Sequence, residues 1–182
     1  MTVVQPGGYR SSMLQVRRAT PADAEAIALV HVASWQWAYA GLLPADRLAA
    51  LDTEQRAQRW RQVLTEPSDA MTLVGERDDR IVGFASVGPA RGDDVAAGVG
   101  ELWGLYVHPD VAGDGTGYRL HEAAMAWLRE QGARSAVLWM LRGNTRAHVF
   151  YERQGWRLDG GEKVDERPDG FVLNEIRFSR PL

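Results

Sequence analysis

The stretch Val107–Glu122, which reads VHPDVAGDGTGYRLHE, has three glycines within five residues, just before an amphipathic segment. Glycine loses more backbone entropy on folding than any other residue, so Gly113, Gly115 and Gly117 indicate a turn that requires bare backbone. A strand, a glycine-rich turn and a helix start together form an anion site, because the first N–H groups of a helix lack internal partners and carry partial positive charge. The stretch therefore predicts a turn whose amides at 113–118 surround a phosphate group.

Two common nucleotide-binding motifs do not fit this turn. The Walker phosphate loop needs Gly-Lys-Ser/Thr after its glycines, and Tyr118 and Arg119 stand there instead. The dinucleotide fingerprint needs G-x-G-x-x-G, whereas Gly113–Gly117 read G-x-G-x-G. From this stretch alone, a tight turn that binds nothing remains the alternative interpretation.

The segments on either side of the turn predict a mixed α/β domain. Alternating polarity indicates strands, and apolar residues three and four apart indicate helices. The expected strands cover 14–20, 71–77, 80–88, 100–109 and 134–144, with a final strand pair in 156–181, and the expected helices cover 20–41, 44–67, 118–131 and 145–155. The central strand–helix–strand unit favours parallel pairing, and the hairpins on either side favour antiparallel pairing. We therefore expect a three-layer α/β/α fold around a mixed sheet.

Composition indicates a globular protein with one domain. Of its 182 residues, 45% are hydrophobic and 25% are charged, and the formal net charge is −3. No apolar run reaches the ~18–20 residues of a membrane helix, and no basic block is long enough to suggest a nucleic-acid surface. We expect a flexible tail at 1–13, a single domain at 14–182, a cytoplasmic location, and neither a nucleic-acid nor a membrane partner.

Cysteine and histidine usage argues against several kinds of site. The chain has no cysteine, which excludes disulfides, thiolate zinc sites and a cysteine nucleophile. The four histidines stand at 31, 108, 121 and 148, and none has a paired metal-ligand spacing with another. We therefore expect no metal site, and we expect histidines that are structural or on the surface.

Two separated segments carry a resemblance to a known family. ELWGLYVHPDVAGDGTGYRLHEAAMAWL at 101–128 resembles the acyl-CoA-binding core of the GCN5-related N-acetyltransferase (GNAT) family, and GNTRAHVFYERQGW at 143–156 resembles the second signature of that family. The matching positions are Val107, Pro109, Gly115, Gly117, Asn144, Ala147, Phe150, Tyr151, Gly155 and Trp156. Two motifs in the right order, with a strand between them, are more specific than either alone. The element order matches the family fold from about residue 14 onward.

The resemblance implies a fold, a reaction and a co-substrate. The fold is that of acyl-CoA N-acyltransferases, and the reaction is direct transfer of an acetyl group from acetyl-CoA to a primary amine of a small molecule or peptide, without a metal. Members often pair as homodimers through their C-terminal strands. The implied coenzyme-binding residues are Leu105, Tyr106, Val107, Ala112, Gly113, Asp114, Gly115, Thr116, Gly117, Asn144 and Tyr151, the first three through a strand backbone that is open to the pantetheine arm.

The resemblance also implies catalytic roles for Tyr151 and Glu101. Tyr151 matches the family tyrosine near the coenzyme sulfur and is expected to be the general acid. Glu101 matches the carboxylate base of one branch, where an apolar cleft beside Trp103 would raise its pKa. In other branches of the family the base is a glutamate at the position that Trp139 occupies here, so the resemblance implies no base at that position in this chain. Each of these residues also has a purely structural interpretation. Tyr151 could be a tyrosine packed on its helix, Glu101 an exposed glutamate at a strand end, and Asn144 a helix cap.

Two positions depart from the family pattern. Ala112 stands at the usual glutamine or arginine, and Asp114 stands where a basic residue is frequent. Both changes remove favourable interactions with a diphosphate, and a like charge there costs ~1 kcal/mol when exposed. A non-catalytic acyl-CoA-binding relative with a weakened loop is therefore the alternative to an active enzyme.

Aromatic residues form a further group, since seven tryptophans in 182 residues is a high count. The end of the first long helix borders the acceptor pocket in the family that the chain resembles. Most of these rings are expected in the core, and one or two of them to wall a pocket for an apolar or cationic amine. The candidates for that pocket are Trp35, Trp37, Tyr39, Trp103 and Trp139.

Overall fold

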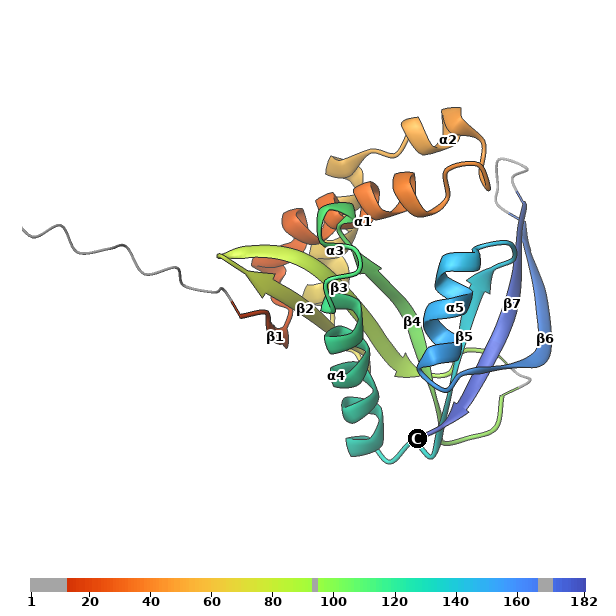
Figure 1. The fold of residues 1–182 in the computed structure, drawn as a ribbon. Helices are drawn as coiled ribbons and strands as arrows, with labels where there is room; N and C mark the ends of the chain where they lie inside the picture. The colour runs from red at the N-terminus through yellow and green to blue at the C-terminus, as the bar shows by residue number, and fades with distance from the viewer. Residues whose placement is uncertain (1–12, 93–94, 167–171) are drawn as a thin grey trace, which may run out of the picture.

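A mixed sheet with the strand order β1-β2-β3-β4-β5-β7-β6 runs through the protein in the computed structural model, which describes residues 13–92, 95–166 and 172–182 (Figure 1). The strands are β1 (Gln15–Arg18), β2 (Met71–Arg77), β3 (Arg80–Pro89), β4 (Val99–Val107), β5 (Ser135–Leu141), β6 (Arg157–Glu166) and β7 (Val172–Pro181). The helices are α1 (Ala24–Ala38), α2 (Ala45–Ala49), α3 (Thr53–Thr65), α4 (Thr116–Glu130) and α5 (Thr145–Arg153), with short 3₁₀ turns η1 (Pro21–Asp23) and η2 (Pro109–Val111). The tail expected at 1–13 lies outside the described residues, apart from Met13.

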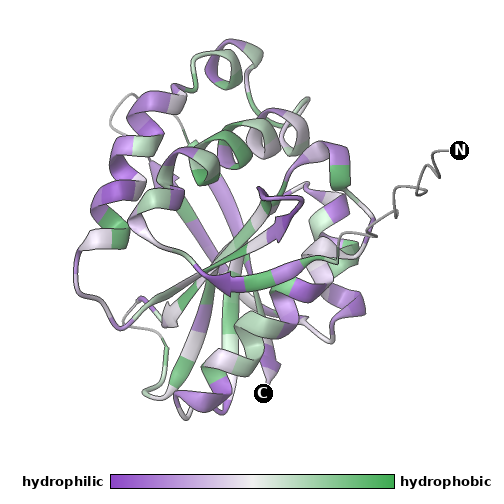
Figure 2. Cartoon of the chain, turned by 90° about the vertical axis from the view of Figure 1, so that its left-hand side faces the viewer, coloured by the Kyte–Doolittle hydropathy of each residue, from purple (hydrophilic) through white to green (hydrophobic). Residues whose placement is uncertain are grey.

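Helices cover both faces of the sheet, as the three-layer prediction requires. α4 and α5 pack on one face, and α1 and α3 pack on the other (Figure 1). Hydrophobic residues concentrate in the strands between these layers (Figure 2). The core on the α4 side includes Leu120, Leu138, Trp156 and Phe178, and the core on the α1 side includes Ile27, Val74 and Phe84.

The strand pairing agrees with the sequence-based topology. β4 and β5 are parallel and are joined through α4, whereas the other neighbouring pairs are antiparallel. The hairpin between β2 and β3 turns at Asp78 and Asp79, whose φ angles of 50° and 58° are positive. Aspartate tolerates this conformation better than most residues, so a tight two-residue turn forms there.

The helical region expected at 44–67 is divided into two helices. α2 ends at Ala49, and a new helix begins after Asp52, whose Oδ1 accepts a hydrogen bond from the Gln55 backbone N–H at 2.9 Å. An aspartate at this position satisfies one of the free amides of a helix start, which favours a restart over a continuous helix. α3 is therefore placed independently of α2, and it turns one face toward β3 and β4.

Neither a membrane-spanning helix nor a metal cluster is present in the described parts of the chain. No helix there combines the length and the apolar character needed to cross a bilayer. The same residues hold no group of three or more His, Cys, Asp or Glu side chains that could bind a metal ion.

One histidine is a structural part of the core. His121 on α4 is fully buried, and its Nε2 accepts a hydrogen bond from the Trp156 indole N–H at 2.9 Å. Burial, together with the charge of Arg180, lowers the pKa of His121 to about 4. The imidazole is therefore neutral in the folded protein near pH 7, as its role as an acceptor requires.

This depressed pKa predicts a loss of stability as the pH falls from ~6.5 toward about 4. In that range the unfolded chain binds a proton at His121 that the folded protein excludes, so this group lowers the free energy of unfolding by about 1.4 kcal/mol per pH unit. His121→Gln keeps a hydrogen-bond acceptor for Trp156 and removes the titration. Urea unfolding across this range should show a shallower pH dependence for the variant, and equal slopes would contradict the assignment.

Candidate active site

The parallel ladder between β4 and β5 ends halfway along the two strands. It runs from the pair Val99 and Ser135 to the pair Leu102 and Leu138. Beyond it, β4 stays with β3 and β5 stays with β7, so the sheet opens between them. The β4 backbone at 105–107 has no strand partner on this side among the described residues, although buried backbone polar groups normally have partners.

A β-bulge in β4 lies where the two strands part. Ser86 of β3 pairs with Gly104, but the next residue of β3, Val87, pairs with Leu102, which leaves Trp103 as an extra residue in β4. A Cβ atom at Gly88 would come within 2.6 Å of Trp103 Cζ2, so a glycine at that position makes room for the indole. Bulges bend a strand and increase its twist, which accounts for the divergence of β4 from β5.

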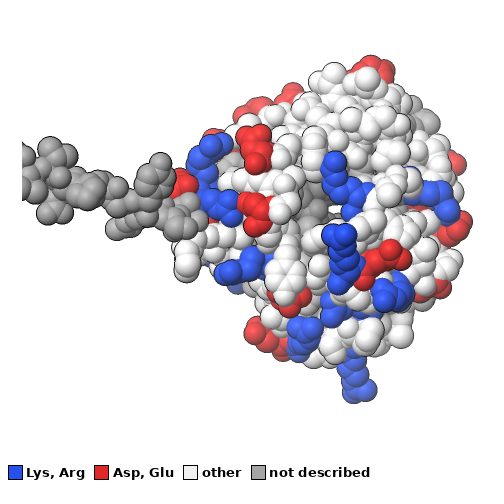
Figure 3. Space-filling view, in the orientation of Figure 1, with Lys and Arg blue, Asp and Glu red and all other residues white. Residues whose placement is uncertain are grey.

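The glycine turn connects the open end of β4 to α4. Gly113 and Gly115 have φ angles of 91° and 94°, and a Cβ atom at either position would meet nothing within 4 Å. These glycines are therefore required by backbone conformation, and the space above them is open. Thr116 begins α4, and its side chain is buried. Basic side chains border a hollow on this face of the molecule (Figure 3).

Asp114 does not point freely into solvent. Its Oδ1 accepts a hydrogen bond from the Thr116 backbone N–H at 2.8 Å, and its Oδ2 accepts one from the guanidinium of Arg77, at the end of β2, at 2.5 Å. Burial raises the pKa of Asp114, but the hydrogen bonds from Thr116 and Arg77 outweigh burial and hold this pKa below its ordinary value. The negative charge expected to weaken the turn is thus balanced by an arginine that is distant in sequence.

The second signature places Tyr151 and Asn144 on α5. Tyr151 is 8% exposed, and burial, with a smaller contribution from Tyr106, raises the pKa of its hydroxyl. The Asn144 side chain accepts a hydrogen bond from the Ala147 backbone N–H at 3.1 Å, so it caps the helix as the alternative interpretation stated. Tyr151 is therefore a buried, protonated tyrosine on a short capped helix.

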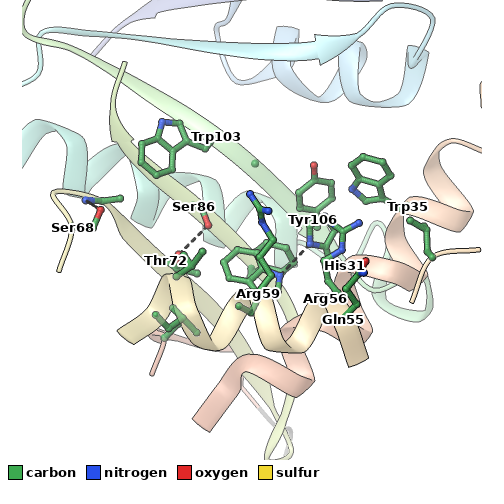
Figure 4. A pocket seen from close by; sticks show the side chains of 18 of the residues that line it. His31, Trp35, Gln55, Arg56, Arg59, Ser68, Thr72, Ser86, Trp103 and Tyr106 are labelled. Atoms are coloured by element: carbon green, nitrogen blue, oxygen red, sulfur yellow. Dashed lines mark hydrogen bonds between the residues drawn. The ribbon is translucent and has the colours of Figure 1, made fainter. Parts of the chain in front are cut away.

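Two cavities lie on the face of the sheet that α1 covers, with volumes of about 1270 Å³ and about 480 Å³. Figure 4 shows the larger of them. Trp35 and Trp103 line both of them, and Tyr39 and Trp139 line the smaller one. Trp37 lines neither: it is 39% exposed, and the guanidinium of Arg146 on α5 lies 3.6 Å from its ring centre. Four of the five predicted aromatic residues therefore surround the cavities, and Trp37 instead bridges to α5.

Tyr106 forms the wall between these cavities and the open strand edge. Its ring stacks on His31 of α1 with centroids 4.9 Å apart, and the Trp60 indole N–H donates to His31 Nδ1 at 3.2 Å. Burial, with a contribution from the charge of Arg56, lowers the pKa of His31 to about 3. A neutral histidine therefore holds the Tyr106 ring in place from α1.

The environment of Glu101 differs from the expected apolar cleft. Glu101 is 2% exposed, and its Oε1 accepts a hydrogen bond from the Arg91 guanidinium at 2.6 Å. Its Oε2 accepts a second one from the Arg91 backbone N–H at 2.8 Å. The expectation of an apolar setting is wrong, because an ion pair occupies this place, although Glu101 does lie beside Trp103 in the smaller cavity.

These elements coincide with the segment that a family comparison matches. The model of the "Acetyltransferase (GNAT) family" matches residues 30–156, which include the split strands, the glycine turn and α5. The chain belongs to the GNAT acetyltransferase family. The family, the fold and the enzyme class predicted from the sequence, an acetyl-CoA-dependent N-acetyltransferase, are confirmed.

Similar proteins extend over most of the GNAT domain. An uncharacterised N-acetyltransferase of Bacillus subtilis is 28% identical over 166 residues, 91% of this chain and 89% of the relative. An aminoglycoside N(6')-acetyltransferase type 1 of Stenotrophomonas maltophilia is 32% identical over 145 residues, 78% of this chain and 84% of the relative. The structure of yncA from Salmonella typhimurium, with its cofactor acetyl-CoA, has a TM-score of 0.65 at 25% identity and covers 94% of this chain and 95% of that chain.

Several polar residues of the GNAT site escaped the sequence analysis. His31, Arg77 and Arg91 lie outside both signatures, and no local pattern connects them to the residues that they contact. Glu175 lines the smaller cavity and pairs with Lys163 at 3.0 Å. For Glu175 a signal existed, because it stands two residues after the buried Leu173 and so shares its face of β7. A carboxylate on that face could have been predicted to line the site.

Proposed function

We propose that this protein transfers the acetyl group of acetyl-CoA directly to the primary amine of a small molecule or peptide. The observation that carries the proposal is the opening between β4 and β5, which leaves the β4 backbone at 105–107 without a strand partner on that side among the described residues. The β4 backbone at 105–107 can pair with an extended ligand chain as an added strand would. Acetyl-CoA supplies the thioester that the amine attacks, and the acetyl C–S bond breaks as the amide bond forms.

The turn at 112–117 supports binding of the coenzyme diphosphate. The positive φ angles of Gly113 and Gly115 shape it, the space around both is open, and the first amides of α4 follow. Ala112 offers no side-chain donor, but Arg77 lies at the same turn and is already oriented toward a carboxylate. In the proposal, Arg77 provides the positive charge that position 112 lacks, and Asp114 and the diphosphate share it.

Tyr151 is the proposed general acid. Its hydroxyl is protonated near pH 7, as that of an ordinary tyrosine is, so it can donate a proton to the thiolate that leaves. Burial raises its pKa and so makes it a weaker acid than an exposed tyrosine. The proposed transfer needs no covalent enzyme intermediate, which agrees with a chain that has no cysteine.

Glu101 is the proposed acceptor of the amine proton, through a water molecule. It precedes Leu102, where the pairing of β4 with β5 ends. Both of its carboxylate oxygens bind Arg91, whose side chain is 60% exposed. Arg91 can therefore release one oxygen to a water molecule without disturbing the core.

Tyr151→Phe tests the function and the acid together. Removal of a general acid should lower kcat by ~10²–10⁴-fold, while the Kd of acetyl-CoA stays within about twofold. Release of free thiol from acetyl-CoA, measured over a panel of amines, gives kcat, and calorimetry gives the Kd. An unchanged kcat would remove Tyr151 as the acid, and a parent protein that releases no thiol with any amine would contradict the proposed function.

Glu101→Gln tests the base. The acidic limb of the pH dependence of kcat/KM should disappear, because that limb reports protonation of the group that accepts the amine proton. Arg91→Gln is the matched comparison: it breaks the same ion pair but keeps the carboxylate, so its acidic limb should persist. If the limb survives in Glu101→Gln, the proton goes directly to solvent or to another residue.

Charge changes at the turn test the diphosphate site. Arg77→Gln should raise the Kd of coenzyme A roughly fivefold or more, and Asp114→Asn should lower it by a similar factor, since one charge at a partly exposed site is worth about 1 kcal/mol. Asp110→Asn is the control, because its carboxylate is 80% exposed. Calorimetric titration measures all three, and the same Kd for Arg77→Gln as for the parent would contradict this role of Arg77.

A further inference from the structure

The larger cavity has a strongly positive lining. Among the described residues that form it, the charged ones are five arginines and one glutamate: Arg18, Arg47, Arg56, Arg59, Arg91 and Glu66. Arg91 pairs with the buried Glu101, and Glu66 is the carboxylate among the described residues of the lining. A concave surface with charge of one sign focuses its field, so this cavity attracts anions and repels cations.

Two of these arginines extend from α3 toward the reaction centre. Arg56 and Arg59 stand three residues apart and so lie on one face of the helix. Both reach toward β4, where Trp103 and Tyr106 form the far wall (Figure 4). The guanidinium of Arg56 lies 5.6 Å from the centre of the Trp35 ring, and its charge influences the titration of Tyr106.

The remaining polar side chains of the cavity lining carry no charge near neutral pH. His31 accepts the Trp60 indole N–H and carries no charge at neutral pH, because its pKa is lowered to about 3. The Trp35 indole N–H is buried at the border between the two cavities, within hydrogen-bonding reach of the Tyr106 hydroxyl.

Acidic side chains line the smaller cavity, which adjoins the larger one at Trp103 and Tyr106. The smaller cavity is lined by Glu101, Asp165 and Glu175, beside Arg91 and Lys163. The two cavities share Trp35, Trp103 and Tyr106. A molecule that spans them meets the arginines of α3 at one end and, at the other, the carboxylates of β4, β6 and β7 together with Arg91 and Lys163. This arrangement favours an acceptor with charges of opposite sign at its two ends.

We propose that the acceptor is an amine that also carries an oxyanion, a carboxylate or a phosphate, which Arg56 and Arg59 bind. Its amino group then lies toward the opening between β4 and β5. The inference rests on the proposed function and names the acceptor class. Guanidinium groups bind both oxyanions through paired, charge-assisted hydrogen bonds, whereas a polycationic amine would bring further positive charge against the arginines.

Five amines that differ only at the end remote from the amino group test the proposal. They are 4-(aminomethyl)benzoate, 4-(aminomethyl)phenyl phosphate, 4-(aminomethyl)benzamide, 4-(aminomethyl)benzamidine and benzylamine. Binding is followed through quenching of tryptophan fluorescence, since Trp35, Trp60 and Trp103 line the cavity, and acetylation is followed through thiol release. We expect the benzoate or the phosphate to exceed the neutral amide at least tenfold in affinity and in kcat/KM, and the amidine to rank lowest. The member that binds more tightly distinguishes carboxylate from phosphate.

Variants of the α3 arginines test whether these residues cause the preference for an anionic amine. Arg59→Gln should lower the affinity for the preferred anion about tenfold or more and leave the affinity for the amide within about twofold. Arg59→Glu should reverse the order of benzoate and benzamidine. The matched control is Arg61→Gln on the same helix, because the Arg61 guanidinium donates to Glu25 at 2.5 Å. This variant should retain the preference of the parent.

The two readouts separate this proposal from the proposed function. If the anions bind preferentially through Arg59 but no amine is acetylated, the acceptor class stands and the proposed transfer fails. If the amines are acetylated but the amide or the amidine binds as tightly as both anions, the transfer stands and the anionic acceptor is overturned. An anion preference that persists in Arg59→Glu would also overturn it.

Discussion

The early end of the β4–β5 ladder is the constraint on which the rest of the site depends. A parallel pair that continued past Leu102 and Leu138 would satisfy the backbone of β4 and leave no place for a ligand chain. The bulge at Trp103 prevents that continuation, and Gly88 makes the bulge sterically feasible. The unmatched backbone edge, the position of the turn after β4 and the two cavities behind it all follow from this local divergence of two strands.

Local signals predicted the architecture well. The turn at Asp78 and Asp79, the helix after the glycines and the cap at Asn144 each follow from residues within one or two turns of chain, where propensity and capping act. The restart at Asp52 was missed, because the helical pattern of α3 obscures a single capping residue within the predicted segment. The strand–helix–strand order around the glycine turn predicted the parallel pairing. The resemblance to the family added the residues expected to border the site, which periodicity alone does not specify.

Ion pairs between distant segments could not be predicted in the same way. Asp114 looked unfavourable as a loop residue read alone, because its partner, Arg77, precedes it by 37 residues in another strand. Glu101 looked like a carboxylate in an apolar cleft, because Arg91 approaches it from beyond the end of β3. In both cases the sequence shows a carboxylate, but the arginine that neutralises it comes from a distant segment. Which segments meet depends on the order of strands in the sheet, and local sequence does not show that order. The arginines of α3 belong to the same class, since helical spacing places them on one face without indicating what that face contacts.

Tyr106 connects the open edge of β4 with the helix layer that contains α1. Its peptide backbone lies on the open edge of β4, while its ring lies against His31 in the α1 layer, over Gly104, where a Cβ atom would come within 2.8 Å of Tyr106 Cε2. Tyr106 thus presents its main chain to the opening between β4 and β5, and its side chain to the cavities on the α1 side of the sheet. Because this ring stacks on His31, a displacement of helix α1 would also shift the open edge of β4 that carries the Tyr106 backbone.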